Sequence, residues 1–254
     1  TGMQAQELNV EVISNNIANM RTTGFKQVRA EFQDLLYQDI RRVGANSSAS
    51  GNIIPTGVQV GYGVKTGATA RIMTQGNLQQ TGKELDLAIR GEGFFSVQTP
   101  DGQTAYTRDG SFELDANGNL VTLDGFQVQP NITVPNNARS ITINREGEVQ
   151  ALLDTSTTPT NLGQIQLSRF VNKAGLQSIG DNLYLETPAS GAAINGTGDT
   201  AGFGSISQQF LENSNVNAVS ELSDLISAQR AYEMNAKVIS ASDEMMQAST
   251  NIVR

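Results

Sequence analysis

The sequence predicts an α+β fold in which N- and C-terminal α-helices pair as a coiled coil and flank an all-β, sandwich-like or barrel-like domain. Two observations lead to this prediction. Runs near both ends are helix-periodic without Gly or Pro, and the long middle is Gly-rich and strand-like. We divide the chain into a terminal helical polymerisation domain (1–26 and 211–254), a connecting segment (27–63) and a β domain (64–210).

The N-terminal helix is predicted from the periodic run that ends near Asn19. One stripe contains Val10, Ile13, Ile17 and Met20, and another contains Leu8, Val12, Asn15 and Asn19. The second stripe becomes amide-rich, and buried amides fix a register because each donor and acceptor needs a partner. We expect Gly24 to end this helix, since Gly readily takes the left-handed conformation after a last turn.

The connecting segment has two parts. For residues 27–42 both readings stay open, since Val28, Phe32, Leu35 and Leu36 fit a helix, whereas Phe25–Arg29 also fits a strand. Residues 43–63 begin with a Gly/Ser/Asn-rich stretch whose composition is that of a flexible loop. Ile53, Ile54, Val58 and Val60 then give an apolar, partly alternating pattern that could dock onto a neighbouring molecule. The alternative is a passive surface loop.

The middle of the chain has the pattern of short antiparallel strands. The predicted strand runs are Leu85–Ile89, Phe94–Val97, Ser111–Leu114, Gly125–Val128, Ile141–Ile143, Ile165–Val171 and Leu183–Leu185. Turn dipeptides separate them, at Asp101-Gly102, Asp109-Gly110, Asn117-Gly118, Asp124-Gly125 and Glu146-Gly147. Asp-Gly and Asn-Gly favour tight hairpins, so we expect a sandwich or a barrel.

The C-terminal helix is apolar on two opposite faces. One stripe is a heptad-type seam with polar interruptions, formed by Leu222, Leu225, Gln229, Tyr232, Ala236, Ile239, Asp243, Met246, Thr250 and Val253. The other is apolar at every position: Ala231, Met234, Val238, Ala241, Met245, Ala248 and Ile252. A shift of two residues is about 200° around a helix, and a surface helix of a monomer needs only one apolar stripe.

Two-faced helices at both ends suggest a subunit that polymerises through its ends. The predicted subunit-interface residues are Val10, Ile13, Asn15, Asn16, Ile17, Asn19, Leu222, Leu225, Tyr232, Met234, Val238, Ile239, Met245 and Ile252. The alternative is that both helices lie in the core of one globular domain.

The composition argues against most catalytic chemistry. The chain has no Cys and no His, which excludes Ser-His-Asp triads, Cys-His dyads and His- or Cys-ligated zinc. The acid pairs Glu84 with Asp86 and Asp109 with Asp115 read as solvated strand and turn residues, and Asp115–Asn119 reads as a hairpin turn rather than a calcium loop. We therefore predict no catalytic residues, no cofactor and no metal. The net charge of -8 disfavours nucleic-acid binding, and no apolar run is long enough to span a bilayer.

Several ordered blocks resemble the bacterial flagellar rod and hook protein family. They are Asn15–Asn19, Thr23–Lys26, Gly76–Gln79, Leu85–Ile89, Gly91–Phe95, Tyr106–Phe112, Ser214–Asn217 and Gln229–Glu233. The resemblance covers nearly the whole chain and is closest to the distal rod branch, whose members carry an extra segment at the position of residues 43–63. Members also have a short helical stretch before the position of Thr1, so we expect the given chain to lack its first residues.

The resemblance implies a structural subunit of the distal rod, a rigid hollow drive shaft that transmits torque from motor to hook and lets export substrates pass. It implies export without cleavage through the flagellum's own secretion channel and a place in the basal body, from the periplasm to the outer membrane ring. The implied partners are copies of the chain, other rod and hook subunits at the tube ends and the surrounding ring proteins, with no membrane insertion.

Three alternatives remain open at this point. Within the family, the chain could be a hook or proximal rod subunit, although residues 43–63 argue against both. Outside it, a secreted β-rich adhesin module would need a binding surface and no polymer of itself. A carboxylate-dependent hydrolase has almost nothing in its favour.

Overall fold

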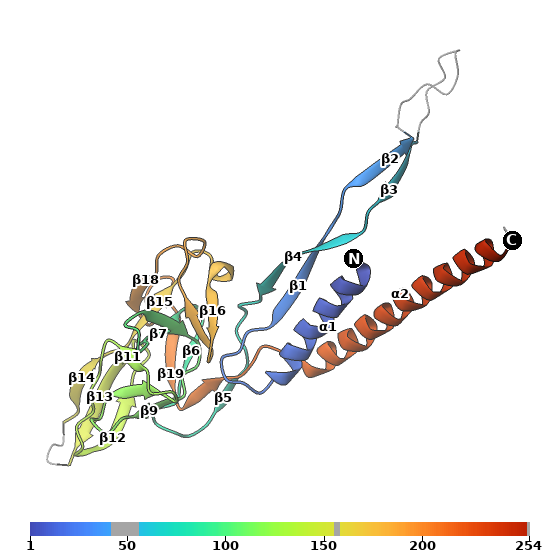
Figure 1. Cartoon of the computed structure of the whole chain (residues 1–254). Helices are drawn as coiled ribbons and strands as arrows, with labels where there is room; N and C mark the ends of the chain where they lie inside the picture. The colour runs from blue at the N-terminus through green and yellow to red at the C-terminus, as the bar shows by residue number, and fades with distance from the viewer. Residues whose placement is uncertain (42–55, 155–157, 253–254) are drawn as a thin grey trace. The chain divides into compact units, whose positions relative to one another are not determined.

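The computed structural model in Figure 1 describes residues 1–41, 56–154 and 158–252. Two helices flank a large β-rich region, which confirms the predicted α+β class. The chain forms two compact units. The helical unit comprises Thr1–Ile17, Val28–Ala70 and Ala218–Arg254, and the β unit comprises Ala18–Gln27 and Arg71–Asn217. The domain boundaries predicted at 26/27, 63/64 and 210/211 stay a prediction.

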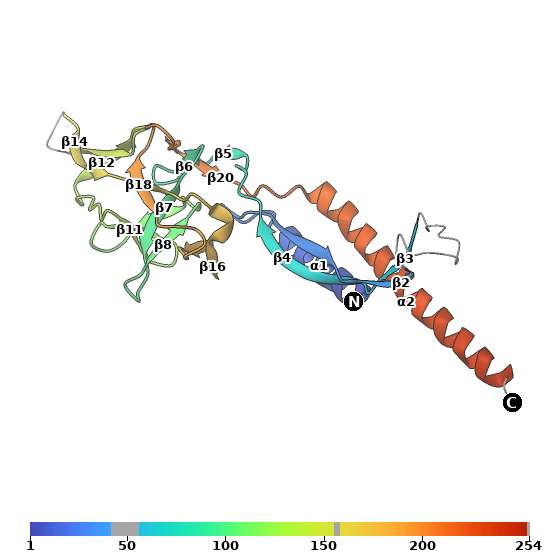
Figure 2. The same cartoon turned by 90° about the horizontal axis from the view of Figure 1, so that it is seen from above.

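The helical unit contains α1 (Gly2–Ala18), α2 (Ala218–Ile252) and two β ribbons. Strand β1 (Val28–Asp34) pairs with β4 (Val64–Arg71), and β2 (Tyr37–Arg41) pairs in antiparallel fashion with β3 (Val58–Gly61). The 35 residues of α2 form one continuous helix, which Figure 2 shows without a break. Neither α1 nor α2, as far as the structure describes them, is long and apolar enough to cross a membrane.

Helix and strand were both open for residues 27–42, and within the described residues Val28–Asp34 and Tyr37–Arg41 form strands. Val28, Ala30 and Phe32 alternate as the half-covered positions of β1, while the residues between them are exposed. This period of two is that of a strand with one covered face. The distant strand β4 supplies the backbone partners that decide for strand over helix.

The β unit is built from short strands, and each predicted strand run overlaps one of them. The strands are β5 (Leu78–Gln80), β6 (Leu87–Arg90), β7 (Phe94–Gln98), β8 (Thr104–Thr107), β9 (Phe112–Leu114), β10 (Leu120–Thr122), β11 (Gln127–Gln129), β12 (Ala138–Ile143), β13 (Glu148–Leu153), β14 (Thr160–Gln164), β15 (Gln166–Arg169), β16 (Gln177–Gly180), β17 (Leu183–Leu185), β18 (Ile194–Thr197), β19 (Ser205–Gln208) and β20 (Phe210–Glu212). A short 3-10 helix occupies Lys173–Gly175.

Several antiparallel sheets make up this unit. The largest has nine strands in the order β16-β17-β8-β7-β11-β10-β9, with β15 and β18 branching from β7. Strands β12, β13 and β14 form a second sheet, and the pairs β19-β6 and β20-β5 form two smaller ones. The first strand of the β unit, β5, therefore pairs with its last strand, β20.

Four of the five predicted hairpin turns are confirmed. The dipeptides ending in Gly102, Gly118, Gly125 and Gly147 each connect two paired strands, and all four glycines have positive φ. The prediction for Asp109-Gly110 is wrong, because β8 and β9 on either side of it do not pair. Gly110 is instead a site of close approach, where a Cβ would lie 1.6 Å from the Leu87 carbonyl oxygen.

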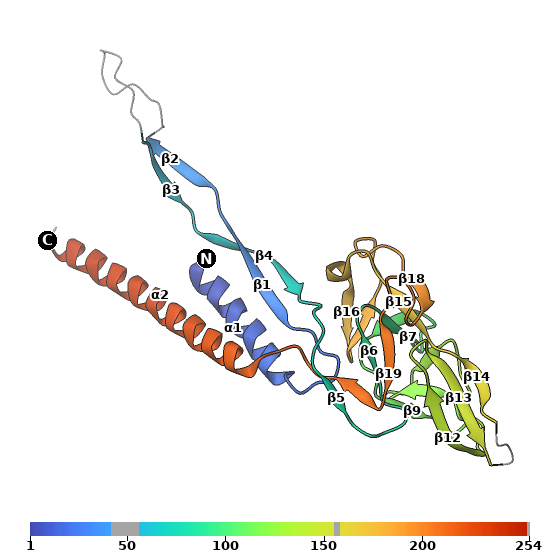
Figure 3. The same ribbon diagram turned by 180° about the vertical axis from the view of Figure 1, so that it is seen from behind.

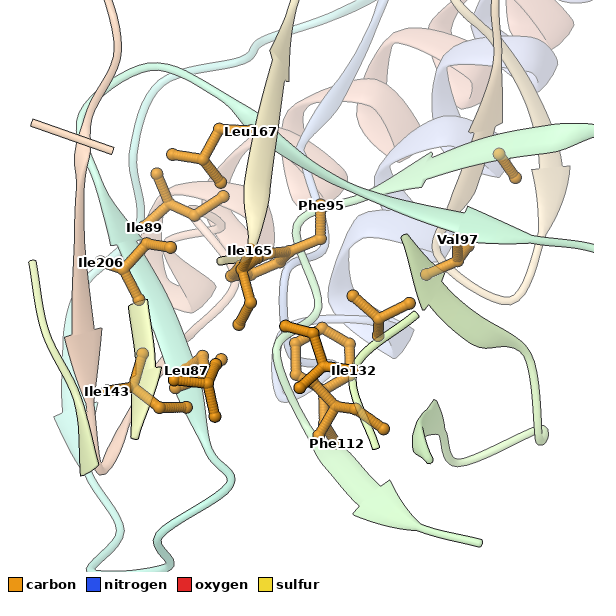
Figure 4. Packing of buried hydrophobic residues seen from close by; sticks show 14 of the residues in the cluster. Leu87, Ile89, Phe95, Val97, Phe112, Ile132, Ile143, Ile165, Leu167 and Ile206 are labelled. Atoms are coloured by element: carbon orange, nitrogen blue, oxygen red, sulfur yellow. The ribbon is translucent and has the colours of Figure 1, made fainter. Parts of the chain in front are cut away.

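One hydrophobic core joins these sheets (Figure 4). It includes Leu87 and Ile89 of β6, Phe95 of β7, Leu167 of β15 and Ile206 of β19, all almost fully buried. The rings of Phe95 and Phe112 meet edge to face with centroids 5.1 Å apart. Because each fully buried large apolar side chain contributes about 1.5–3 kcal/mol, this core is the main source of stability in the β unit.

Candidate subunit interface

Helices α1 and α2 lie side by side and run antiparallel (Figures 1 and 3). At one end Asn16 Nδ2 donates a hydrogen bond of 3.1 Å to Glu221 Oε2. At the other, a Cβ on Gly2 would lie 3.4 Å from Asn235 Nδ2. Both helices advance by fourteen residues between these two points, so the register is uniform. The part of α2 after Asn235 therefore extends beyond Thr1.

Asn16 joins three elements of the helical unit. Its Nδ2 donates to the Val28 carbonyl oxygen at 2.8 Å, and its Oδ1 accepts from the Val28 N–H at 2.9 Å. Together with the bond to Glu221, these contacts connect α1 to β1 and to α2. Asn16 is almost fully buried, and a buried amide with all these partners fixes a register. The sequence had placed this role on the stripe with Asn15 and Asn19, but Asn15 is exposed and Asn19 is only half-buried. Asn16 therefore makes its contacts inside the protomer.

The covered face of α2 differs from the predicted heptad seam. The covered or half-covered side chains include Glu221, Leu225, Ala228 and Asn235, which are mostly polar or small. Of the predicted seam, Leu225 and Ala236 are half-buried, whereas Leu222, Tyr232 and Ile239 are exposed. The buried Asn16–Glu221 contact fixes this rotation of α2, which the apolar pattern could not reveal.

Most of the predicted interface residues on α2 are exposed in the protomer. The exposed fractions of Leu222, Tyr232, Met234, Val238, Ile239 and Met245 lie between 40% and 68%. The side chain of Ile252 lies outside the described residues. Met234, Val238 and Met245 lie on one face of α2, and Leu222, Tyr232 and Ile239 lie on the opposite stripe, so both apolar stripes have exposed members in the protomer. Large exposed apolar patches are a common feature of interaction sites.

On the N-terminal side the predicted interface residues fall into three environments. Ile13 and Asn16 are buried, Val10 and Ile17 are half-buried, and Asn15 is exposed on α1. Asn19 lies in the turn after α1, where its Oδ1 accepts a hydrogen bond of 3.1 Å from Thr22 Oγ1. Of the predicted docking segment, Val58 and Val60 are exposed on β3, and Ile53 and Ile54 lie outside the described residues.

A buried ion cluster holds the two ends of the β unit together. Glu212 accepts from Lys26 Nζ at 2.5 Å and from Arg108 Nη1 at 3.2 Å. The Gly76 N–H donates to the same carboxylate at 2.9 Å. Lys26 also donates to the Thr74 carbonyl oxygen at 2.8 Å. All three charged side chains are nearly or fully buried, so the cluster joins the N-terminal segment, β20 and the end of β8.

Burial and pairing act against each other in this cluster. Burial lowers the pKa of Lys26 and of Arg108, while the negative charge of Glu212 and its hydrogen bonds raise both. Arg108 also donates to the Gly91 carbonyl oxygen at 2.7 Å, and its guanidinium carbon lies 5.3 Å from the Phe94 ring centroid. Glu212 is the carboxylate shared by both cations, so the cluster depends on it most.

Gly24 and Asn215, which are close in sequence to Lys26 and Glu212, make further contacts within the β unit. Gly24 has a φ of +69°, and a Cβ there would lie 2.7 Å from the Asp109 nitrogen. Its expected role as the stop of the first helix is wrong, since α1 already ends at Ala18. Asn215 accepts from the Gln27 N–H at 2.7 Å and donates to the Ile72 carbonyl oxygen at 2.8 Å.

The sequence analysis did not predict that Lys26, Arg108 and Glu212 form a buried cluster, because nothing in the local pattern brings these distant residues together. The signal that could have pointed to such contacts is position, since Gly24, Lys26, Arg108 and Asn215 all lie inside the recognised blocks.

Three of the four acidic side chains considered for catalysis, those of Glu84, Asp109 and Asp115, have structural partners. Asp115 accepts from the backbone N–H groups of Asn119 and Asn117, and hydrogen bonds from Asn119 lower its pKa. Asp109 accepts from Ser111, and Glu84 accepts from the Ile141 N–H. Among the described residues no group of three or more acidic side chains could hold a metal ion.

Two terminal helices and a large β-rich region define an α+β protein, and α2 carries exposed apolar side chains. Three family descriptions match the chain: "Flagella basal body rod protein" at residues 1–26, "Flagellar hook protein FlgE/F/G D1 domain" at 88–151 and "Flagellar basal body rod FlgEFG protein C-terminal" at 207–252. The chain belongs to the bacterial flagellar rod and hook protein family.

Full-length similarity joins the chain to rod proteins. It is 58% identical over 252 residues to the flagellar basal-body rod protein FlgG of Caulobacter vibrioides, which covers 99% of this chain and 96% of that protein. It is 53% identical to the FlgG of Agrobacterium fabrum, with 96% and 94% covered. By contrast, the 45% identity to the flagellar hook protein FlgE of Helicobacter mustelae spans 51% of this chain and 28% of that protein.

Proposed function

We propose that the chain is a structural subunit of the flagellar basal-body rod, and that it polymerises into a rigid hollow shaft through its terminal helices. The observation that carries this proposal is the exposed apolar face of α2, formed by residues such as Met234, Val238 and Met245. The relatives that match the chain over its full length are named as basal-body rod proteins. The shaft transmits torque from motor to hook, and its lumen passes export substrates.

In this proposal α1 and α2 pair as a coiled coil near the axis of the tube. The residues with exposed apolar side chains on α2 contact neighbouring copies, together with Val10, Asn15 and Ile17 of α1. Ile13 and Asn16 act inside each subunit, because both are buried there. Residues 1–26 and 211–254 are the polymerisation domain, and residues 64–210 form the outer shell.

The location is the flagellar basal body, and we assign the subunit to the distal rod between the periplasm and the outer membrane ring. Its partners are other copies, further rod and hook subunits at the tube ends and the surrounding ring proteins. The partial match to a hook protein, against full-length matches to rod proteins, favours the rod.

Electron microscopy of concentrated protein tests the proposal: open tubes support it, and a protein that stays monomeric supports the adhesin alternative.

Limited proteolysis of the monomer should remove most of the helices and spare the β unit. Trypsin is expected to cleave first after Arg230 and Lys237, which are exposed on α2, and last after the buried Lys26 and Arg108. A helix with few buried contacts is marginal in water, so it opens to proteases readily. In assembled tubes the two α2 sites should become protected. Cleavage after Lys237 and Arg108 at equal rates in the monomer would contradict polymerisation-coupled ordering.

The segment of residues 43–63 is proposed to stiffen the shaft by docking onto a neighbouring subunit. Deleting Ala45–Val60 is expected to give curved or flexible tubes in electron micrographs. A finer variant, Val58→Ser with Val60→Ser, keeps the backbone pairing of β3 with β2 and removes only exposed apolar side chains. Tubes of this double variant should also bend more easily than tubes of the parent. Tubes as straight as those of the parent in both variants would show that the segment is passive.

A further inference from the structure

A groove with an acidic rim runs between α1 and α2. Its lining residues are Glu7, Val10, Glu11, Gln229, Tyr232 and Glu233, around a hollow of about 340 Å³. Val10 and the ring of Tyr232 supply apolar surface, and three carboxylates surround it. Among the described residues no Lys or Arg pairs with Glu7, Glu11 or Glu233. The groove therefore has an apolar surface bordered by three carboxylates that form no ion pair within the described part of the protomer, although Arg230 and Lys237 are the i−3 and i+4 neighbours of Glu233.

A surface of complementary character lies elsewhere on α2. Arg230, Met234 and Lys237 follow one another at spacings of four and three residues, so they are neighbours on one face. Arg230 and Lys237 are exposed, and Met234 is 60% exposed. We call these three residues the basic ridge. At about 100° per residue the ridge lies roughly a third of a turn from the groove, so a subunit cannot fill its own groove with its own ridge.

We propose that the groove between α1 and α2 of one copy receives the basic ridge of α2 of a second copy in the polymer. Met234 enters the hollow against Val10 and Tyr232, and Arg230 and Lys237 pair with the rim carboxylates. The inference rests on the proposed function, since it needs an assembly of many copies. It adds the specific contact that selects the neighbour and fixes its register.

Two features favour a second copy as the occupant. The groove and the ridge are different patches of one molecule, so their contact is heterologous and repeats from subunit to subunit, as growth of an open tube requires. The occupant must also combine an apolar side chain with flanking cations, and the ridge offers that combination on a regular helix. Arg and Lys have aliphatic stems, which can cover the apolar surface while their charged ends reach the rim.

Charge exchange between the two surfaces tests the contact. A groove variant carries Glu7→Lys and Glu11→Lys, a ridge variant carries Arg230→Glu and Lys237→Glu, and a third variant carries all four changes. Like charges should block assembly in each double variant, with at least a tenfold rise in the concentration needed for sedimentable tubes. The fourfold variant restores opposite charges and should recover tubes. Asp101→Lys with Asp124→Lys, at two exposed acids of the β unit, changes the net charge by the same amount as the groove variant and should assemble normally.

The outcomes separate this inference from the proposed function. If the unmodified chain forms no tubes, the proposed function fails first. If it forms tubes and the groove variant assembles as readily, the function stands and the groove contact is wrong. The contact is also wrong if the fourfold variant stays monomeric although circular dichroism shows that it has the same helix content as the parent monomer.

Discussion

Replacing Val238 and Met245 by Glu is expected to abolish polymer formation while the β unit stays folded. Both side chains are 68% exposed in the protomer, so the substitutions should leave the monomer unaffected. In the polymer each carboxylate would be buried without a partner, at a cost of several kcal/mol per charge. We expect no sedimentable tubes at concentrations where the parent assembles completely, and unchanged thermal unfolding of the β unit.

A matched variant distinguishes the effect of the introduced charges from the effect of losing the original Val238 and Met245 side chains. Val238→Leu with Met245→Leu keeps both positions apolar and should assemble near the parental concentration, because swaps of similar volume cost little. Normal tubes from the Glu variant would show that this face of α2 does not lie between subunits.

Replacing Glu212 by Ala is expected to destabilise the β unit strongly, by about 3–5 kcal/mol, because it leaves two buried cations without their shared anion. A domain of this size is stable by only about 5–15 kcal/mol, so the loss is a large part of the total. Denaturant unfolding followed by a probe of the β unit measures it. Glu212→Gln should lose less, since the amide oxygen can still accept from the Gly76 N–H.

The surface ion pair of Lys83 with Glu113 provides the control. Both side chains are about half exposed, and Glu113→Ala should cost at most about 1 kcal/mol. If Glu212→Ala cost no more than this control, the buried cluster would not hold the ends of the β unit together. A large loss would also predict freer cleavage after Lys26, which the cluster protects in the parent.

The local patterns predicted the strands and helices well. Hairpin glycines such as Gly118 and Gly125 have backbone requirements that depend on a few neighbouring residues, so the sequence reveals them. Val28 and Phe32 were ambiguous because four-residue spacing fits a helix and is also a multiple of the strand period. Only β4, more than thirty residues away, decides for the strand.

The candidate interface was predictable in part. The apolar face of α2 with Met234, Val238 and Met245 was read directly from its spacing. The side of α2 that faces α1 was not, because Asn16 and Glu221 fix it through a hydrogen bond between residues 205 positions apart. The Lys26–Glu212 pair was hidden for the same reason, since its burial depends on packing across the whole β unit.

A helical reconstruction of tubes assembled from this chain tests the central claim most directly. The account predicts terminal helices near the axis, with Val238 and Met245 of each copy buried against helices of neighbouring copies and the β units outside. A tube in which that face of α2 contacts only solvent, or in which the β units alone join the copies, would contradict polymerisation through the chain ends.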